Sequence, residues 1–188
     1  DTTLPSVRDA VRRHGDAILG GTYTPLPADA DFFSTFQSVF IHHSETRLPE
    51  PDYIASHAMV IRKGTFHASG GFPEAFLPVI EDVDLSHRLR RSGHRLLMVP
   101  GVLVRHNFNF TFTRSLRNAF RKSRYWTVYS LRNGDVLADS GTASLGMKIN
   151  VLTFLVGAVI ALHALAAGAG PLLGVLPLAL GATLIANR

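Results

Sequence analysis

Cysteine is absent from the 188-residue sequence, which excludes disulfide bonds and any metal site built on thiolates. The absence fits a reducing compartment, although it does not require one. The sequence also lacks a glycine-rich phosphate-binding loop of the G-x-x-x-x-G-K type, zinc-finger spacing and an RNA-recognition signature. There is no internal repeat, no initial methionine and no signal-peptide pattern. We therefore expect a fragment of a longer protein that binds nucleotide poorly by itself.

No charged residue lies between Lys148 and Arg188. The apolar run is interrupted at Gly168–Pro171, which leaves two segments, 149–167 and 172–186. At about 1.5 Å per residue, the first segment comes close to the roughly 30 Å thickness of a bilayer's hydrocarbon core. We predict a transmembrane helical hairpin. Its flanking basic residues place that side in the cytoplasm by the positive-inside rule, at the inner (plasma) membrane.

Acidic residues are missing from another stretch, Arg105 to Arg132, within a chain of net charge +5 and pI about 10.1. Apolar and aromatic side chains there recur at roughly helical spacing, which predicts an amphipathic helix bearing Trp and Phe on an anionic membrane surface. Nucleic-acid binding is the rival use of this charge, and the neighbouring membrane segment and missing motifs argue against it. The apolar side consists of Leu116, Phe120 and Leu131, joined by Tyr125 and Trp126.

Acidic residues are concentrated instead at Glu81, Asp82 and Asp84, shortly after the glycine pair Gly70-Gly71. A helical pattern follows directly, so these carboxylates face the unpaired N–H groups and the positive end of a helix dipole. That position keeps a carboxylate ionised and aimed, as a general base or a hydroxyl or metal ligand requires. The alternative is that the acids merely cap the first helical turn.

The stretch GGF…EDVDLSHRLRRSGHRLLMVPGVLVRH resembles the second half of the catalytic domain of family 2 glycosyltransferases, over roughly residues 1–131. The resemblance implies an α/β fold of the GT-A type, with the trailing part of a Rossmann-like, three-layer mixed sheet. It also implies an inverting sugar transfer in which the Glu-Asp pair carries the catalytic base. Transferred to this sequence, the base is Asp82, with Glu81 beside it.

The same resemblance assigns an acceptor pocket to the residues around the glycine pair. Gly70, Gly71 and Phe72 would shape it, with Asp84 as a further acceptor-binding residue. The alternative is that the two glycines form a simple turn and that Phe72 belongs to the core.

A divalent cation, Mg or Mn, is the cofactor that the resemblance implies. Asp1 matches the second aspartate of the family's Asp-x-Asp motif, and His106 matches a histidine that serves as a further ligand. Neutral imidazole is a competent ligand for manganese-like ions. The alternatives are that Asp1 is a polar terminus and that His106 is a polar residue at a strand end.

Arg121-Lys122-Ser123-Arg124-Tyr125-Trp126 faintly resembles the Gln-x-x-Arg-Trp motif of processive family members. It departs from the motif by Arg121 in place of glutamine and by Tyr125 inserted before the tryptophan. Arg121 and Arg124 are therefore candidates for binding the leaving diphosphate, and membrane-surface charge is the alternative role.

Periodicity and turn residues predict the elements of the chain. A short amphipathic helix is expected in an otherwise loop-rich region, 28–51, and antiparallel edge strands are expected around 53–62 and 95–104. We predict a glycosyltransferase part over residues 1–132, a linker over 133–148 and transmembrane helices over 149–188. The remaining predicted elements are a helix over 7–14, a strand within 16–24, a helix over 83–91, and two short strands, 95–99 and 102–104, separated by Pro100-Gly101.

The sequence as a whole predicts a membrane-anchored inverting glycosyltransferase of the hexosyltransferase type. Its partners would be a nucleotide-sugar donor and a lipid-linked or polysaccharide acceptor. This chain would lack the donor-binding half and be inactive alone. The alternative is a non-catalytic membrane-associated module that binds glycan or anionic lipid or helps to assemble a cell-envelope polymer.

Overall fold

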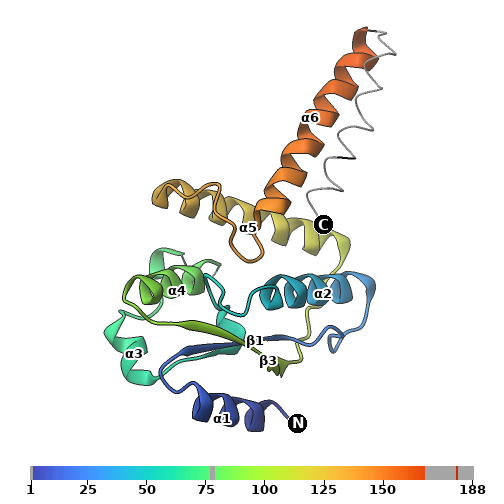
Figure 1. Ribbon diagram of the computed structural model, residues 1–188. Helices are drawn as coiled ribbons and strands as arrows, with labels where there is room; N and C mark the ends of the chain where they lie inside the picture. The colour runs from blue at the N-terminus through green and yellow to red at the C-terminus, as the bar shows by residue number, and fades with distance from the viewer. Residues whose placement is uncertain (1, 77–78, 168–180, 182–188) are drawn as a thin grey trace. The chain divides into compact units, whose positions relative to one another are not determined.

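The computed structural model describes residues 2–76, 79–167 and 181 (Figure 1). The chain divides into two compact units, Asp1–Val136 with Ser140–Thr142, and Leu137–Asp139 with Ala143–Arg188. The first unit is a mixed α/β arrangement, and α6 belongs to the second. The described elements are, in order, α1 (Thr3–Arg13), β1 (Ile18–Tyr23), α2 (Phe32–Thr46), the short 3-10 helix η1 (Ser56–Ala58), β2 (Met59–Val60), α3 (Lys63–Ala68), the 3-10 helix η2 (Glu74–Phe76), α4 (Glu81–Arg91), β3 (Leu96–Val104), α5 (Phe112–Asn133) and α6 (Leu145–Ala167).

The first unit is built on a three-stranded mixed sheet in the order β2-β1-β3. β1 pairs with β2 antiparallel and with β3 parallel. In Figure 1, α1 lies on one face of this sheet and α2 and α4 lie on the other. The main core cluster joins the sheet to α4 and consists of Ile18, Ile54, Leu85, Leu89 and Leu96.

Strand β3 differs from the prediction in two ways. It is parallel to its neighbour rather than antiparallel, and it is one strand rather than two. Its pairing moves from Met98, opposite Gly20, to Leu103, opposite Thr22, so extra residues of β3 bulge out between these pairs. The bulge contains the exposed Pro100-Gly101. A bulge tolerates the missing N–H of a proline, so these residues interrupt the pairing without ending the strand.

The antiparallel edge strand predicted around 53–62 is confirmed as β2 in direction and position, but it is much shorter, because only Met59–Val60 pair with β1. Tyr53 and Ile54 are buried as expected. The backbone of Ile54 is satisfied by a side chain, since its N–H donates to Ser86 Oγ on α4 at 3.1 Å. An apolar run therefore packs beneath a helix here without joining the sheet.

The helices are longer than the sequence patterns predicted. α2 extends over 15 residues in the region expected to be loop-rich. Its first turn is fixed by Asp31, whose carboxylate accepts hydrogen bonds from the N–H groups of Phe33 and Ser34. Such a cap satisfies donors that the first helical turn leaves unpaired. The helix predicted over 83–91 begins two residues earlier, so the acidic cluster lies inside the first turn of α4.

Helix α5 confirms the predicted amphipathic helix. Thr111 caps its start by accepting a hydrogen bond from Arg114 N–H, and Gly134, with φ of 70°, ends it. The apolar residues predicted to share one side of this helix lie on two different sides. Tyr125 and Trp126 pack against a second core cluster, Tyr53, Ile80, Val83 and Tyr129. The other apolar residues face solvent, with exposed fractions of 61% for Leu116, 76% for Phe120 and 66% for Leu131.

In the second unit, α6 extends over 23 residues, and its segment Leu145–Ala164 is long and apolar enough to cross a membrane. It begins four residues before the predicted segment and includes Lys148, whose Nζ donates to Ala138 O at 2.6 Å. The predicted second apolar segment, 172–186, and the break before it fall almost wholly outside the described residues.

Candidate active site

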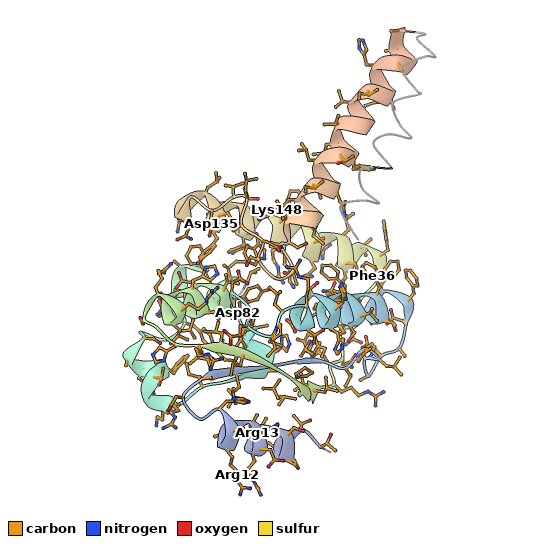
Figure 2. The ribbon with its side chains drawn as sticks, viewed as in Figure 1. Arg12, Arg13, Phe36, Asp82, Asp135 and Lys148 are labelled. Atoms are coloured by element: carbon orange, nitrogen blue, oxygen red, sulfur yellow. The ribbon has the colours of Figure 1, made fainter. Side chains whose placement is uncertain are left out.

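A small cavity of about 110 Å³ lies in the first unit, with Asp82 in its wall. β1, α2, the segment around η1, α4 and α5 all contribute to it. Figure 2 shows Asp82 between α4 and α2, on the opposite side of the sheet from α1. The polar groups that line the cavity are Tyr23, Glu45, Tyr53, His57, Asp82, Lys122 and Thr142. Five segments distant in sequence from Asp82 thus bring acidic, basic and hydroxyl groups around its carboxylate.

Asp82 is fixed by two backbone donors. Its Oδ1 accepts from the N–H of Val83 and its Oδ2 from the N–H of Ser56, each at 2.9 Å. Burial raises the pKa of Asp82, because the charged form loses water, and the hydrogen bonds from Ser56 and Val83 offset part of that rise. The result is an oriented carboxylate that is a stronger base than an exposed aspartate. The helix N-cap position is Ile80, which makes no side-chain cap, so Asp82 is not an N-cap.

Glu81 differs from its neighbour. Burial raises its pKa, and the negative charge of Asp82 adds to the rise. Its buried Oε2 has no hydrogen-bond partner among the residues that the structure describes. Glu81 does not line the cavity, so the two adjacent acids occupy different surroundings.

Glu45 and His57 form a second polar group in the cavity, which the sequence analysis missed. Glu45 Oε2 accepts from Thr22 Oγ1 at 2.7 Å and lies 3.3 Å from His57 Nε2. The ring of His57 stacks on Tyr23, with centroids 3.9 Å apart. Burial, together with the charges of Glu45 and Asp82, raises the pKa of Tyr23 to about 12, so its hydroxyl stays protonated at neutral pH. No local motif marks these residues, because they come from separate elements.

Lys122 is the second omission. It is half-buried in the cavity wall, whereas its neighbours Arg121 and Arg124 are exposed. Burial lowers the pKa of Lys122, and the charges of Asp82 and Glu45 oppose this effect. A usable signal was present in the sequence. Lys122, Trp126 and Tyr129 are spaced by four and three residues, which places them on one face of a helix.

The residues assigned to the acceptor pocket do not line the Asp82 cavity, and Gly71 and Asp84 contact Arg88 instead. Gly70 and Gly71 have positive φ, 81° and 62°, which glycine adopts without strain. Arg88 donates to the carbonyl groups of Ser69 and Gly71, and its Nε donates to Asp84 Oδ2 at 2.8 Å. Asp84 therefore orients the arginine that holds the glycine turn.

Phe72 follows this turn and is 37% exposed. Its ring meets Phe66 edge-on at 5.2 Å between centroids. Neither the glycine turn nor Phe72 lines the Asp82 cavity.

Arg121 lines a separate groove of about 430 Å³ along the first half of α5. Arg114 and Arg117 line it too, so three guanidinium groups with no acid among the lining residues face one hollow. Arg114 Nη1 donates to Asn109 O at 2.8 Å, and Arg121 Nη2 lies 3.4 Å from Asn118 Oδ1. This arrangement suits an anion. Arg124 lies outside the groove.

His106 is exposed, and its ring stacks on Tyr23 and meets Phe108 edge-on at 4.6 Å. Asp1 lies outside the described residues. In the described part of the chain, no group of three or more histidine, aspartate or glutamate side chains is placed to hold a metal ion. One imidazole is not a sufficient donor set, so the described residues by themselves do not fit the implied divalent cation.

Comparison with known proteins identifies one family. The family model for glycosyl transferase family group 2 matches residues 1–186. Neither a curated protein nor a solved structure matches the chain.

Proposed function

The chain belongs to glycosyl transferase family group 2, and from that premise we propose that Asp82 is the general base of an inverting sugar transfer. One observation carries the proposal. Asp82 is a carboxylate in the wall of a small polar cavity, fixed by two backbone N–H groups and made more basic by burial. A base must be oriented toward the proton that it accepts, and its pKa must lie nearer the working pH than that of an exposed aspartate.

The reaction is a single displacement. The acceptor hydroxyl loses its proton to an oxygen of Asp82 as its own oxygen forms a bond to the anomeric carbon of the donor sugar. The bond from that carbon to the diphosphate of a nucleotide-sugar donor breaks on the opposite face, with its electron pair going to the diphosphate. The configuration at the anomeric carbon is therefore inverted.

The leaving diphosphate is assigned to the groove that contains Arg121. Its three arginines offer charge-assisted hydrogen bonds to phosphate oxygens. Arg124, which the sequence also suggested, is exposed outside this groove, and we assign it to surface charge. The divalent cation that the resemblance implies, with Asp1 and His106 as its ligands, enters no step of this mechanism, because the described residues do not complete a metal site.

We assign the acceptor to a lipid-linked or polysaccharide class and the protein to the inner (plasma) membrane, with the transfer site on the cytoplasmic side. Two features support a membrane setting. The outward face of α5 carries Leu116, Phe120 and Leu131 beside exposed arginines, and α6 is long and apolar enough to span a bilayer. Arginines near an anionic surface each contribute about 1 kcal/mol to binding.

The substitution Asp82→Asn in the full-length protein tests the assignment. It keeps the size of the side chain and one of its two acceptor oxygens but removes the base, so transfer is expected to fall by about 10²- to 10⁴-fold. Binding of the nucleotide-sugar donor, measured by calorimetry, should persist. Asp9→Asn, an exposed change on α1, is the matched control. Transfer at the wild-type rate in the Asp82→Asn variant would remove Asp82 from the mechanism.

A further inference from the structure

The side chain of Lys122 lines the Asp82 cavity. The sequence contains two other lysines. Lys63 is exposed on α3, and Lys148 lies in α6 of the second unit. Lys122 reaches the cavity because its face of α5 also carries Trp126 and Tyr129, which pack onto the core around Tyr53 and Val83. The docking of α5 thus places Lys122 beside the cavity.

The two carboxylates in the cavity differ in their partners. Glu45 has Thr22 and His57 beside it, whereas the hydrogen bonds that fix Asp82 come from the backbone of Ser56 and Val83. A buried carboxylate without a balancing charge is costly. The ionisable groups that face Lys122 from the surrounding elements are Tyr23 of β1, Glu45 of α2, Tyr53, His57 of η1 and Asp82 of α4, and Arg121 is its neighbour on α5.

The size of the cavity keeps these groups close together. The cavity has a volume of about 110 Å³, and its lining residues include Glu45, Asp82 and Lys122. Lys122 and the two carboxylates therefore border the same small space, where opposite charges interact more strongly than at the open surface.

We propose that Lys122 is a positioning residue of the transfer site, whose ammonium group balances the carboxylates of Asp82 and Glu45 and keeps Asp82 ready to accept the proton of the acceptor hydroxyl. The catalytic part of this inference rests on the proposed function. The charge pairing itself does not, because it follows from the groups that share the cavity.

The pairing can be measured without transfer activity. The full-length protein is treated with a trace of acetic anhydride across a pH series, and acetylation of Lys63, Lys122 and Lys148 is quantified by mass spectrometry. Only the neutral amine reacts. In Asp82→Asn, the loss of a neighbouring negative charge should lower the pKa of Lys122 by about one unit, which makes it react about tenfold faster below its midpoint.

Lys63 serves as the internal reference and should keep its profile, and Asp9→Asn should leave Lys122 unchanged. Glu45→Gln should shift Lys122 in the same direction as Asp82→Asn. If the midpoint of Lys122 moves in neither cavity variant, the pairing is overturned.

The catalytic role is tested by Lys122→Met and Lys122→Arg in the transfer assay. Without the positive charge, the pKa of Asp82 should rise, so the acid limb of the kcat/KM profile should move upward by about one pH unit in Lys122→Met. Lys122→Arg keeps the charge and should restore the wild-type limb, and Lys63→Met should not move it. An unmoved limb in Lys122→Met would overturn the role. A wild-type protein without transfer activity would instead refute the proposed function, and the acetylation result would still decide the pairing.

Discussion

The N–H of Ser56 offers the most direct control over Asp82. It donates to Asp82 Oδ2 at 2.9 Å, and Ser56 is the first residue of η1. The residue before it, Ala55, has φ of −69° and ψ of 139°, the extended conformation that a following proline requires. Proline is also well tolerated at the first position of a helix. Ser56→Pro should therefore remove one donor to Asp82 with little disturbance to the backbone.

The expected size of the effect follows from the bond that is lost. A hydrogen bond to a charged group contributes about 1.5–3 kcal/mol, and one pKa unit corresponds to about 1.4 kcal/mol, so the pKa of Asp82 should rise by about one to two units. Burial already raises this pKa, and the substitution acts in the same direction. Because transfer requires the ionised carboxylate, activity falls as the pH drops through the pKa. The fall should therefore occur at higher pH in the variant.

The assay is the pH dependence of kcat/KM for the full-length protein with a nucleotide-sugar donor. Ser56→Ala is the matched control, because it keeps the N–H and loses only the weaker contribution of the hydroxyl, so its acid limb should move less. At pH values well above the limb, Ser56→Pro should approach the wild-type rate. A Ser56→Pro variant with the wild-type limb would refute the reasoning, since it would separate the rate-determining ionisation from Asp82.

Two further predictions concern the sheet and the outer face of α5. In Gly21→Ala the new Cβ would lie 2.3 Å from the carbonyl oxygen of Val102 on the neighbouring strand. The free energy of unfolding, measured in urea titrations, should therefore fall by about 1–3 kcal/mol. The control Gly64→Ala, with nothing within 4 Å of its new Cβ, should cause no loss. In a version truncated before α6, replacing Arg117 and Arg124 by glutamate should release the protein from anionic vesicles in co-sedimentation. The control replaces Arg12 and Arg13 on α1 by glutamate, and equal binding by the two charge-reversed proteins would argue against α5 as the contact surface.

The helices were predictable because their signals are local. The acidic cluster and the apolar spacing after it located α4, and the long basic amphipathic pattern located α5. Strands gave weaker signals. The apolar run over 53–62 looked like a buried strand, and only the packing of Ile54 against Ser86 of α4 shows why most of it is not. The direction of β3 was not predictable, because it depends on the crossover between β1 and β3.

For the candidate site, the family resemblance supplied only Asp82, which it proposes as the base. The residues that surround Asp82 in the structure were not predicted. Glu45 and His57 meet across segments with no shared pattern, and their contact of 3.3 Å arises only when α2 and η1 pack together. Asp84 was assigned to the acceptor because it belongs to the same acidic cluster. Its side chain points to Arg88, since residues two apart on a helix face different directions.

Helix α5 carries both the residue proposed to position Asp82 and the surface proposed to contact the membrane. Its inner face brings Lys122 into the cavity beside Asp82, and its outer face carries Phe120 among exposed arginines. The effects of substitutions should divide in the same way. A charge change at Arg124, outside the arginine groove, should alter binding to lipid and leave the acid limb of the pH profile in place, whereas Lys122→Met should move the limb and leave lipid binding intact. If both kinds of substitution changed both measurements, the helix would be acting as one electrostatic unit, and the inner charge would have no separate role.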